Sequence, residues 1–135
     1  MFNKFNWEDR FTVKVAKMDD QHKVLINYIN KLAETMDTDD YSQIQSAFTN
    51  MANYVVEHFK EEEAFFDSHG FPGAASHKLI HKKLLETVAI YDKQIREHNL
   101  NKSEFYDFLK VWLTSHIVGI DQKYGDYITG AKKSA

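Results

Sequence analysis

The chain has 135 residues, of which 43% are hydrophobic and 27% charged, and its formal net charge is -3. This size and composition are typical of one soluble globular domain with a core of its own. Acidic and basic residues are interspersed, so no basic surface of the kind that binds nucleic acid is expected. The chain contains no cysteine, which excludes disulfides, iron–sulfur clusters and thiolate zinc sites.

The N-terminal sequence MFNKFNWEDRF lacks the continuous apolar segment of a signal peptide. No apolar run approaches the roughly 20 residues that a membrane-spanning helix needs. We therefore expect a soluble, cytoplasmic protein that binds neither a membrane nor nucleic acid. A single proline and five glycines leave most of the chain free of helix breakers, which favours long helices.

Residues 1–18 are predicted to form an extended arm. Phe11, Val13 and Val15 alternate with polar residues, a pattern that is typical of a strand. One strand without a partner is not stable, so we expect an extended segment packed across a helical body.

Four helices are predicted after the arm, because apolar residues recur there at steps of three and four. Their expected ranges are about 19–36, 40–68, 74–98 and 101–119. Their core-facing positions are Leu25, Ile26, Ile29, Leu32 and Met36; Ile44, Phe48, Met51, Val55 and Phe65; Leu84, Val88, Tyr91 and Ile95; and Phe105, Leu109 and Trp112.

Helix starts are marked by capping residues. Asp19 or Asp20 can cap the first helix, and Asn101 can cap the fourth. Asp40 with Gln43 resembles a capping box at the second.

Helix ends are marked by glycine. Gly70 is well placed as the residue that ends the second helix. Gly119 is expected to end the fourth, after which residues 124–128 could add a short turn and 130–135 a frayed tail. The fold class that follows is all-α: an antiparallel up-down-up-down four-helix bundle with an extended N-terminal arm. We divide this single domain into the arm 1–18, the bundle 19–118 and a C-terminal segment 119–135.

Polar residues occupy six core-facing positions of this bundle. A single histidine at such a position is more often a hydrogen-bonded core residue than a metal ligand. Burying one unpaired polar group costs roughly 1–3 kcal/mol, and a bare carboxylate costs more, so six independent cases are improbable. A metal centre at one end of the core would satisfy all of them. The six residues are His22, His58, Glu62, His77, His81 and His116.

The predicted topology brings these six residues to one end of the bundle. His58 and Glu62 are four residues apart, as are His77 and His81, so each pair lies on one side of its helix. Asp121 follows the expected end of the fourth helix and can turn back towards the others.

Four further polar residues are not expected at this centre. His69 lies in the turn after the second helix and His98 in the last turn of the third. Glu61 and Glu63 flank Glu62 and are predicted to form a solvated face. All four are interpreted as surface residues.

Five histidines and two carboxylates exceed the needs of one tetrahedral zinc ion. They suit two first-row metal ions bridged by Glu62 and Asp121. The chain has no Glu-x-x-His, the pattern of ferritin-like carboxylate sites, and no His-Glu-x-x-His, the pattern of common zinc proteases.

These motifs resemble the hemerythrin family in its single-domain bacterial form, over nearly the whole chain. A lead-in with Trp7, Phe11 and Val13 precedes them. The matching motifs, in order and spacing, are Asp19-x-Gln21-His22, His58-x-x-x-Glu62, His77-x-x-x-His81 and Trp112-Leu113-x-x-His116-x-x-x-x-Asp121.

The resemblance implies a cofactor of two iron ions (Fe2+/Fe3+) joined by an oxo or hydroxo bridge. It implies the following assignment: His77, His81 and His116 on one iron, His22 and His58 on the other, and Glu62 and Asp121 bridging both. The two-histidine iron would then keep one open position, where dioxygen would bind. Leu113 and Trp112 match the pocket residues of the family, although Trp112 could equally be plain core packing.

The resemblance therefore implies a reversible dioxygen-binding protein, not an enzyme, that serves as carrier, store or sensor. The alternatives are a di-iron oxidase or peroxidase that uses the same open position, and an iron-handling protein. A sensor would need a protein partner, because no signalling domain is attached to the chain. We expect a monomer.

Overall fold

The structure is a computed structural model that describes residues 2–130. All regular elements of this part of the chain are helical, and none of the helices is long and apolar enough to cross a membrane. The elements are the 3-10 turn η1 (Asp9–Phe11), α1 (Ala16–Met36), α2 (Tyr41–Ser68), α3 (Ala74–Arg96), α4 (Lys102–Ser115), the π-helical turn η2 (His116–Asp121) and α5 (Gln122–Thr129).

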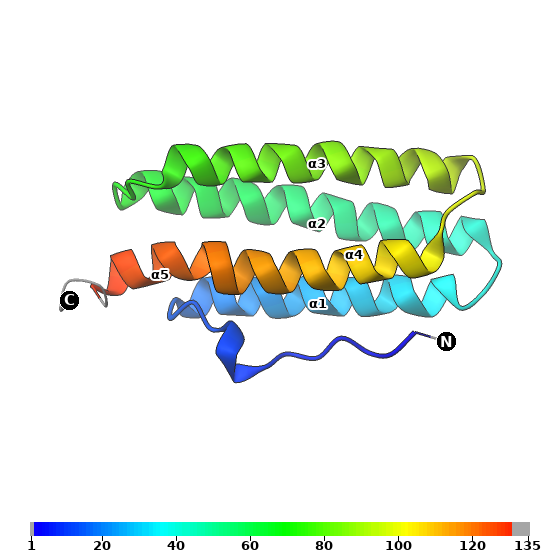
Figure 1. Cartoon of the computed structure of the whole chain (residues 1–135), viewed down its shortest axis with the longest axis horizontal. Coiled ribbons are helices and arrows are strands. Elements are labelled where there is room, and N and C mark those ends of the chain that lie inside the picture. The colour runs from blue at the N-terminus through cyan, green and yellow to red at the C-terminus, as the bar shows by residue number, and fades with distance from the viewer. Residues whose placement is uncertain (1, 131–135) are drawn as a thin grey trace.

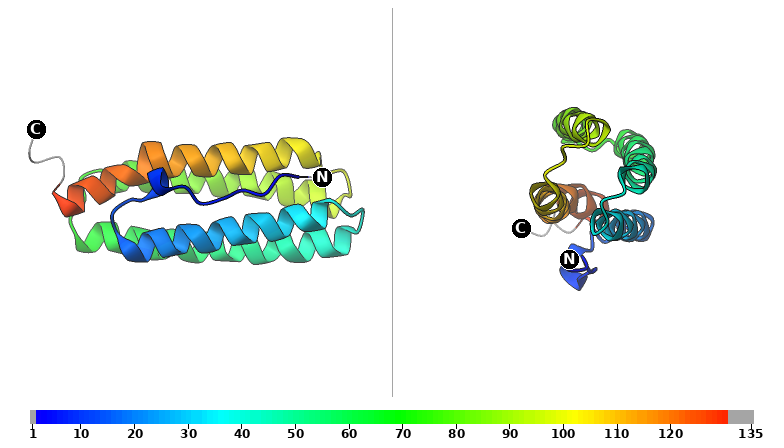
Figure 2. Two further views of the ribbon diagram at one scale, coloured as in Figure 1. Left: turned by 90° about the horizontal axis from the view of Figure 1, so that it is seen from below. Right: turned by 90° about the vertical axis from the view of Figure 1, so that its right-hand side faces the viewer.

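The helices α1 to α4 run antiparallel to their sequence neighbours and form a bundle (Figure 1). Viewed along its axis, the bundle has the four helices at the corners of a square (Figure 2). The predicted all-α, up-down-up-down architecture is thus confirmed. The periodic apolar residues face inwards, with two exceptions. The last core position of α2 belongs to the buried Phe66 and not to the half-buried Phe65, and Trp112 of α4 is also only half-buried.

Two predicted N-caps are confirmed. The Asp40 carboxylate accepts hydrogen bonds from the backbone N–H groups of Ser42 at 3.0 Å and Gln43 at 3.3 Å. The Asn101 side chain accepts one from the N–H of Glu104 at 3.1 Å. Each cap satisfies donors that the first turn of the helix leaves free.

Gly70 ends α2 as predicted. Its φ of +61° is the left-handed conformation that glycine adopts without strain. The N–H of Phe71 then donates to the Phe66 carbonyl at 3.0 Å, and the two rings pack 5.5 Å apart. This Schellman arrangement turns the chain so that α3 returns along α2.

The first helix begins earlier than predicted, at Ala16, and neither Asp19 nor Asp20 is its N-cap. Asp19 lies within the helix. Its carboxylate accepts hydrogen bonds from the Thr12 hydroxyl at 2.5 Å and the Val13 N–H at 2.8 Å. The expected cap is therefore a contact between the helix and the arm.

The fourth helix does not end near Gly119. Its axis continues through the wider turn η2 into α5, which a left-handed Gly130 ends, so residues 124–128 are part of a full helix. Gly119 stays within the helical turn η2 and faces open space. At the other end of α3, Arg96 is the last helical residue. Of the predicted tail, residues 131–135 lie outside the described residues.

The predicted arm is present and runs lengthwise along the bundle between α1 and α4 (Figure 2). Its side chains Phe5, Phe11 and Val13 are buried against the bundle. The Asn30 side chain on α1 accepts from the Phe5 N–H at 2.8 Å and donates to its carbonyl at 2.7 Å, which pairs the arm as a strand would.

Candidate metal centre

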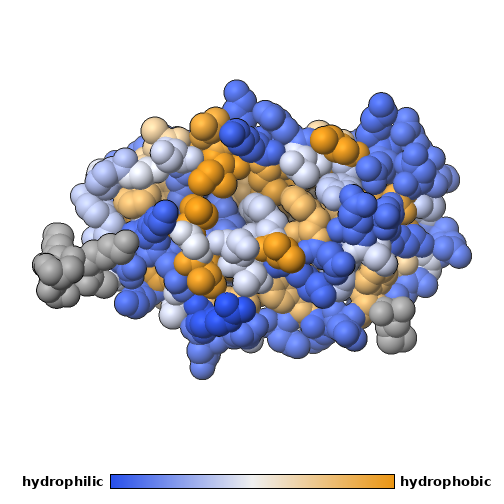
Figure 3. Space-filling model, viewed as in Figure 1, coloured by the Kyte–Doolittle hydropathy of each residue, from blue (hydrophilic) through white to orange (hydrophobic). Residues whose placement is uncertain are grey.

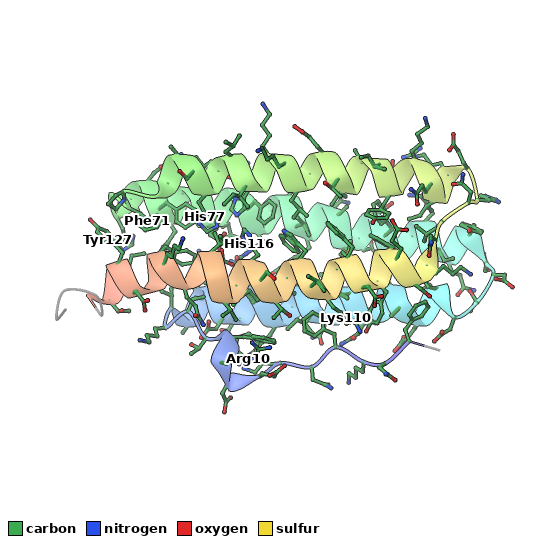
Figure 4. The ribbon with its side chains drawn as sticks, in the orientation of Figure 1. Arg10, Phe71, His77, Lys110, His116 and Tyr127 are labelled. Atoms are coloured by element: carbon green, nitrogen blue, oxygen red, sulfur yellow. The ribbon has the colours of Figure 1, made fainter. Side chains whose placement is uncertain are left out.

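All seven predicted ligands meet inside one end of the bundle. None of them is more than 4% exposed. They come from three helices of the bundle and from the turn that continues the fourth: His22 from α1, His58 and Glu62 from α2, His77 and His81 from α3, and His116 and Asp121 from η2. Figure 4 shows His77 and His116 side by side between α3 and the continuous helix formed by α4, η2 and α5.

Glu62 divides its two carboxylate oxygens between two sets of histidines. Its Oε1 lies 3.0 Å from His81 Nε2 and 3.5 Å from His77 Nε2. Its Oε2 lies 3.4 Å from His58 Nε2 and 3.7 Å from His22 Nε2. A carboxylate in this position can bridge two cations, one on each side.

Asp121 divides its oxygens in the same way. Its Oδ1 lies 2.9 Å from His77 Nε2 and 3.0 Å from His116 Nε2. Its Oδ2 lies 3.1 Å from His22 Nε2. Two groups of possible ligands result, and in each group the donor atoms lie within 4.8 Å of one another. The groups are Glu62, His77, His81, His116 and Asp121, and His22, His58 and Glu62.

The chemistry of the donor atoms suits metal binding better than hydrogen bonding within the site. Several of these atoms are buried and close to one another, yet they form no hydrogen bond. Such unpaired atoms are costly in a core and are rare unless a ligand satisfies them. Imidazole nitrogens with carboxylate oxygens are a donor set that iron and other first-row ions accept. The unpaired atoms are both nitrogens of His22, His81 Nε2, Glu62 Oε1 and both oxygens of Asp121.

Without a cation, the site holds protons in place of metal. Burial lowers the pKa of His22, but the carboxylates of Asp121 and Glu62 outweigh this effect and raise it to about 9. The pKa of His77 is raised to about 9 for the same reasons. Burial raises the pKa of both carboxyl groups, yet the surrounding histidines bring the net pKa well below its ordinary value. A metal ion would replace these protons.

The π-helical turn explains how Asp121 reaches the site. Asp121 follows His116 by five residues, and an ordinary α-helix places residues three or four apart on one face. The wider turn brings both side chains to the same side. The sequence predicted that the chain turns back towards the site at Asp121 after a helix end, but here the helix itself widens.

Three residues that the sequence analysis did not assign to the centre hydrogen-bond its ligands. Gln21 Oε1 lies 2.5 Å from His58 Nδ1, and Glu63 Oε2 lies 2.9 Å from His81 Nδ1. The prediction that Glu63 is only a solvated surface residue is therefore wrong: its side chain is partly exposed, but it also hydrogen-bonds the candidate ligand His81. Such partners fix the ring orientation and direct the other nitrogen, Nε2, at the metal.

The third residue is Tyr124 on α5, whose buried hydroxyl donates a hydrogen bond to Glu62 Oε2 at 2.8 Å. Burial and the neighbouring carboxylates of Glu62 and Asp121 raise the pKa of Tyr124, so it stays a donor. The position of Tyr124 near the site could have been predicted from the sequence, because it follows Asp121 by three residues and so lies on the same helical face.

The predicted pocket residues lie in different surroundings. Leu113 is fully buried in the last turn of α4. Trp112 is half-buried and stacks on the His116 ring, with centroids 5.1 Å apart. Phe59, which the sequence analysis did not single out, stacks on His81 at 3.7 Å.

An apolar pocket of about 370 Å³ opens on the surface beside His116. It lies on the face of the molecule shown in Figure 3, where apolar residues gather between α3 and α4. Its lining residues are Ile80, Phe108, Val111, Trp112, Ser115, His116 and Ile120.

The histidines predicted to lie outside the centre, His69 and His98, are both exposed, which confirms that prediction.

Comparison with known proteins gives one consistent result. The model of the hemerythrin HHE cation binding domain matches residues 13–128. A bacteriohemerythrin from Methylococcus capsulatus is 35% identical over 117 residues, covering 85% of this chain and 88% of that protein. A hemerythrin-like protein from Naegleria gruberi is 34% identical over 120 residues, covering 89% and 90%. A crystal structure of wild-type hemerythrin superposes with a TM-score of 0.86 at 32% identity, covering 93% of this chain and 98% of that one.

Fold and site together define a four-helix bundle with a buried cluster of histidines and carboxylates that could hold metal ions. The chain belongs to the hemerythrin family. This confirms the family predicted from the ligand motifs. Family membership, fold and the buried cluster also support the predicted oxygen-binding, non-haem iron function.

Proposed function

We propose that the protein binds dioxygen reversibly at a centre of two iron ions, as a carrier, store or sensor. One iron would be held by three histidines, His77, His81 and His116, and the other by two, His22 and His58. Glu62 and Asp121 would bridge them, with an oxo or hydroxo bridge beside them. The observation that carries the proposal is the division of each carboxylate between the two sides of the site.

The unequal number of histidines leaves one side short of a ligand. The two bound ferrous ions would supply the open position and the electrons that dioxygen binding requires. The rest falls to the protein. Gln21 and Glu63 orient two of the imidazoles, and Tyr124 keeps a proton on its hydroxyl while it orients Glu62.

Reversible binding requires that bound dioxygen meets neither water nor a proton donor. The seven ligands are almost completely buried, and Leu113 and Phe59 are buried apolar side chains of the neighbouring turns. We assign Leu113 to the oxygen pocket and Trp112 to its outer wall, where it stacks on His116. Apolar surroundings of this kind restrict solvent access to a metal site.

An enzyme, a di-iron oxidase or peroxidase, is the second candidate. The observation in its favour is the open apolar pocket against His116, which offers a reductant or an apolar substrate a place close to one ligand. We favour binding without turnover, because among the described residues every polar side chain in contact with the two carboxylates is either a proposed ligand or Tyr124. The raised pKa of Tyr124 keeps the proton on its hydroxyl.

The test is optical. Protein loaded anaerobically with ferrous iron is exposed to dioxygen, and the gas is then removed under argon while the visible absorption band of the oxygenated form is followed. A band that appears and disappears over repeated cycles supports reversible binding. A band that decays to the ferric form while a reductant is consumed supports the enzyme, and no band at all contradicts the di-iron assignment.

A further inference from the structure

The arm contacts the end of the bundle that carries the candidate ligands through residues 10–14, which we call the clasp. On the α1 side, the clasp binds Asp19 through the Thr12 hydroxyl at 2.5 Å and the Val13 N–H at 2.8 Å. Asp19 precedes the ligand His22 by one helical turn. The clasp therefore fixes the segment that carries His22.

On the α5 side, the clasp binds Gln122, the residue next to the ligand Asp121. The Gln122 side-chain amide donates to the Arg10 carbonyl at 2.7 Å and to the Thr12 carbonyl at 3.2 Å. Figure 4 places Arg10 at the same end of the bundle as His77 and His116.

One turn farther along α5, the backbone of Gly125 packs directly against the backbone of Val13. A Cβ atom on Gly125 would lie 1.9 Å from the Val13 carbonyl oxygen, so only glycine allows the approach. Lys14 adds an exposed ion pair with Asp126 at 3.7 Å. Ion pairs of this kind contribute little to stability. Gln122 and Gly125 are therefore the main contacts of the clasp with α5.

The two ligands that the clasp borders face each other. His22 Nε2 lies 3.1 Å from Asp121 Oδ2, a contact between α1 and η2. We propose that the clasp is a positioning element: through Gln122 and Gly125 it holds Asp121 against the helix that carries His22. It would thereby set the bridging position of Asp121 towards the two-histidine iron.

This proposal rests on the proposed di-iron centre. If the clasp is loosened, Asp121 keeps its contacts with His77 and His116 on the other side, at 2.9 and 3.0 Å. The two-histidine side loses an oxygen ligand that it shares. We therefore expect selective, faster loss of one of the two irons.

The decisive variant is Gln122→Glu, which keeps the shape of the side chain but replaces the donor with a carboxylate facing two carbonyls. Its matched control is Asn30→Asp, which makes the same amide-to-carboxylate change against another arm carbonyl, that of Phe5, at 2.7 Å. Asn30 lies two helical turns beyond His22. A rescue variant, Gln122→Lys, restores a donor for both carbonyls.

The measurement is iron release to an excess of ferrous chelator, followed by absorbance, with the melting temperature of each metal-free variant measured beside it. We expect Gln122→Glu to release one iron about tenfold faster than wild type, the size of effect that supporting residues of metal sites show. Asn30→Asp should lower the melting temperature by a similar amount yet release iron at the wild-type rate, and Gln122→Lys should restore slow release.

Equal release rates for Gln122→Glu and Asn30→Asp would overturn the clasp, because arm loosening alone would then explain both. A wild-type chain that takes up fewer than two irons would overturn the di-iron centre first. Gly125→Ala provides a second route to the same test, with Gly119→Ala as its control, because Gly119 has open space where Gly125 has backbone. Faster release from Gly125→Ala alone supports the clasp, and no difference between the two contradicts it.

Discussion

The two ends of the bundle use the same helices and the same spacing of core residues, but they fill the core differently. At the end distant from the metal ligands, Phe48 packs 5.9 Å from Phe105, which packs 4.4 Å from Tyr91, and Ile44 and Ile95 are buried. At the other end, the equivalent positions carry five histidines and two carboxylates. Packing stabilises the apolar end, whereas we expect bound metal to stabilise the polar end.

The comparison separates what determines the fold from what determines the function. Each step of three or four residues places a side chain in the core, whatever its chemistry. Apolar side chains there gain free energy from burial, at about 25 cal/mol per Å². Imidazole and carboxylate groups lose hydration at the same positions and recover it only from partners.

The largest expected effect is that of iron removal. Metal-free protein should melt at least about 10 °C below iron-loaded protein, because ligand present at a thousand times its Kd adds about 4 kcal/mol to the stability of the folded state. Calorimetry of the two forms at one protein concentration measures this difference. Equal melting temperatures would mean that the polar end satisfies itself without a cation.

Leu113→Ala tests the apolar wall of the site. The loss of a buried leucine should cost about 2–5 kcal/mol and, in addition, speed autoxidation of the oxygenated protein by admitting water. Leu109→Ala is the matched control: it removes an equally buried leucine from the same helix, one turn farther from His116. Both variants should melt lower, but only Leu113→Ala should oxidise faster. Equal autoxidation rates would remove Leu113 from the pocket.

Much of the difference between the apolar end and the polar end of the bundle could be predicted from the sequence. The four helices, two N-caps and the turn at Gly70 follow from local rules, and the topology then brings the six core-facing ligands to one end. A histidine or glutamate in an apolar series is visible because periodicity is a property of the chain itself.

The rest depends on contacts between segments that are distant in sequence. Asp19 resembled an N-cap, but its carboxylate is taken by the arm. Glu63 resembled a surface residue, but α3 brings the His81 ring within 2.9 Å. The π-helical turn was missed because Gly119 resembles a helix end, although the five-residue step from His116 to Asp121 was itself a signal.

His58→Leu sharpens the comparison by giving the polar end an apolar residue. Leucine restores the apolar series between Val55 and Phe66 and removes one buried imidazole, so the metal-free chain should melt at the wild-type temperature or higher. Iron content should fall from two ions to about one, measured by elemental analysis after gel filtration. A metal-free variant that melts well below wild type would show that His58 stabilises the fold without a metal.

The smallest expected effect is the pH dependence of the metal-free protein. The pKa values of His22 and His77 are about 9 in the folded chain and 6.5 when unperturbed, so their contribution to stability is fully present below pH 6.5 and is lost as pH rises through 9. Glu62, whose pKa is lowered below 4.5, contributes in the opposite direction: its stabilisation is present above pH 4.5 and lost at lower pH.

The metal-free chain should therefore be most stable between about pH 4.5 and 6.5 and lose on the order of 1–3 kcal/mol from pH 6.5 to 9. Iron-loaded protein should show no such loss, because ligated imidazoles have no free nitrogen at the site to protonate. Urea unfolding of both forms at pH 6.5 and 9 measures the two slopes. Parallel slopes would place the titrating groups outside the site, and a loss confined to the metal-free form would place them at the polar end of the bundle.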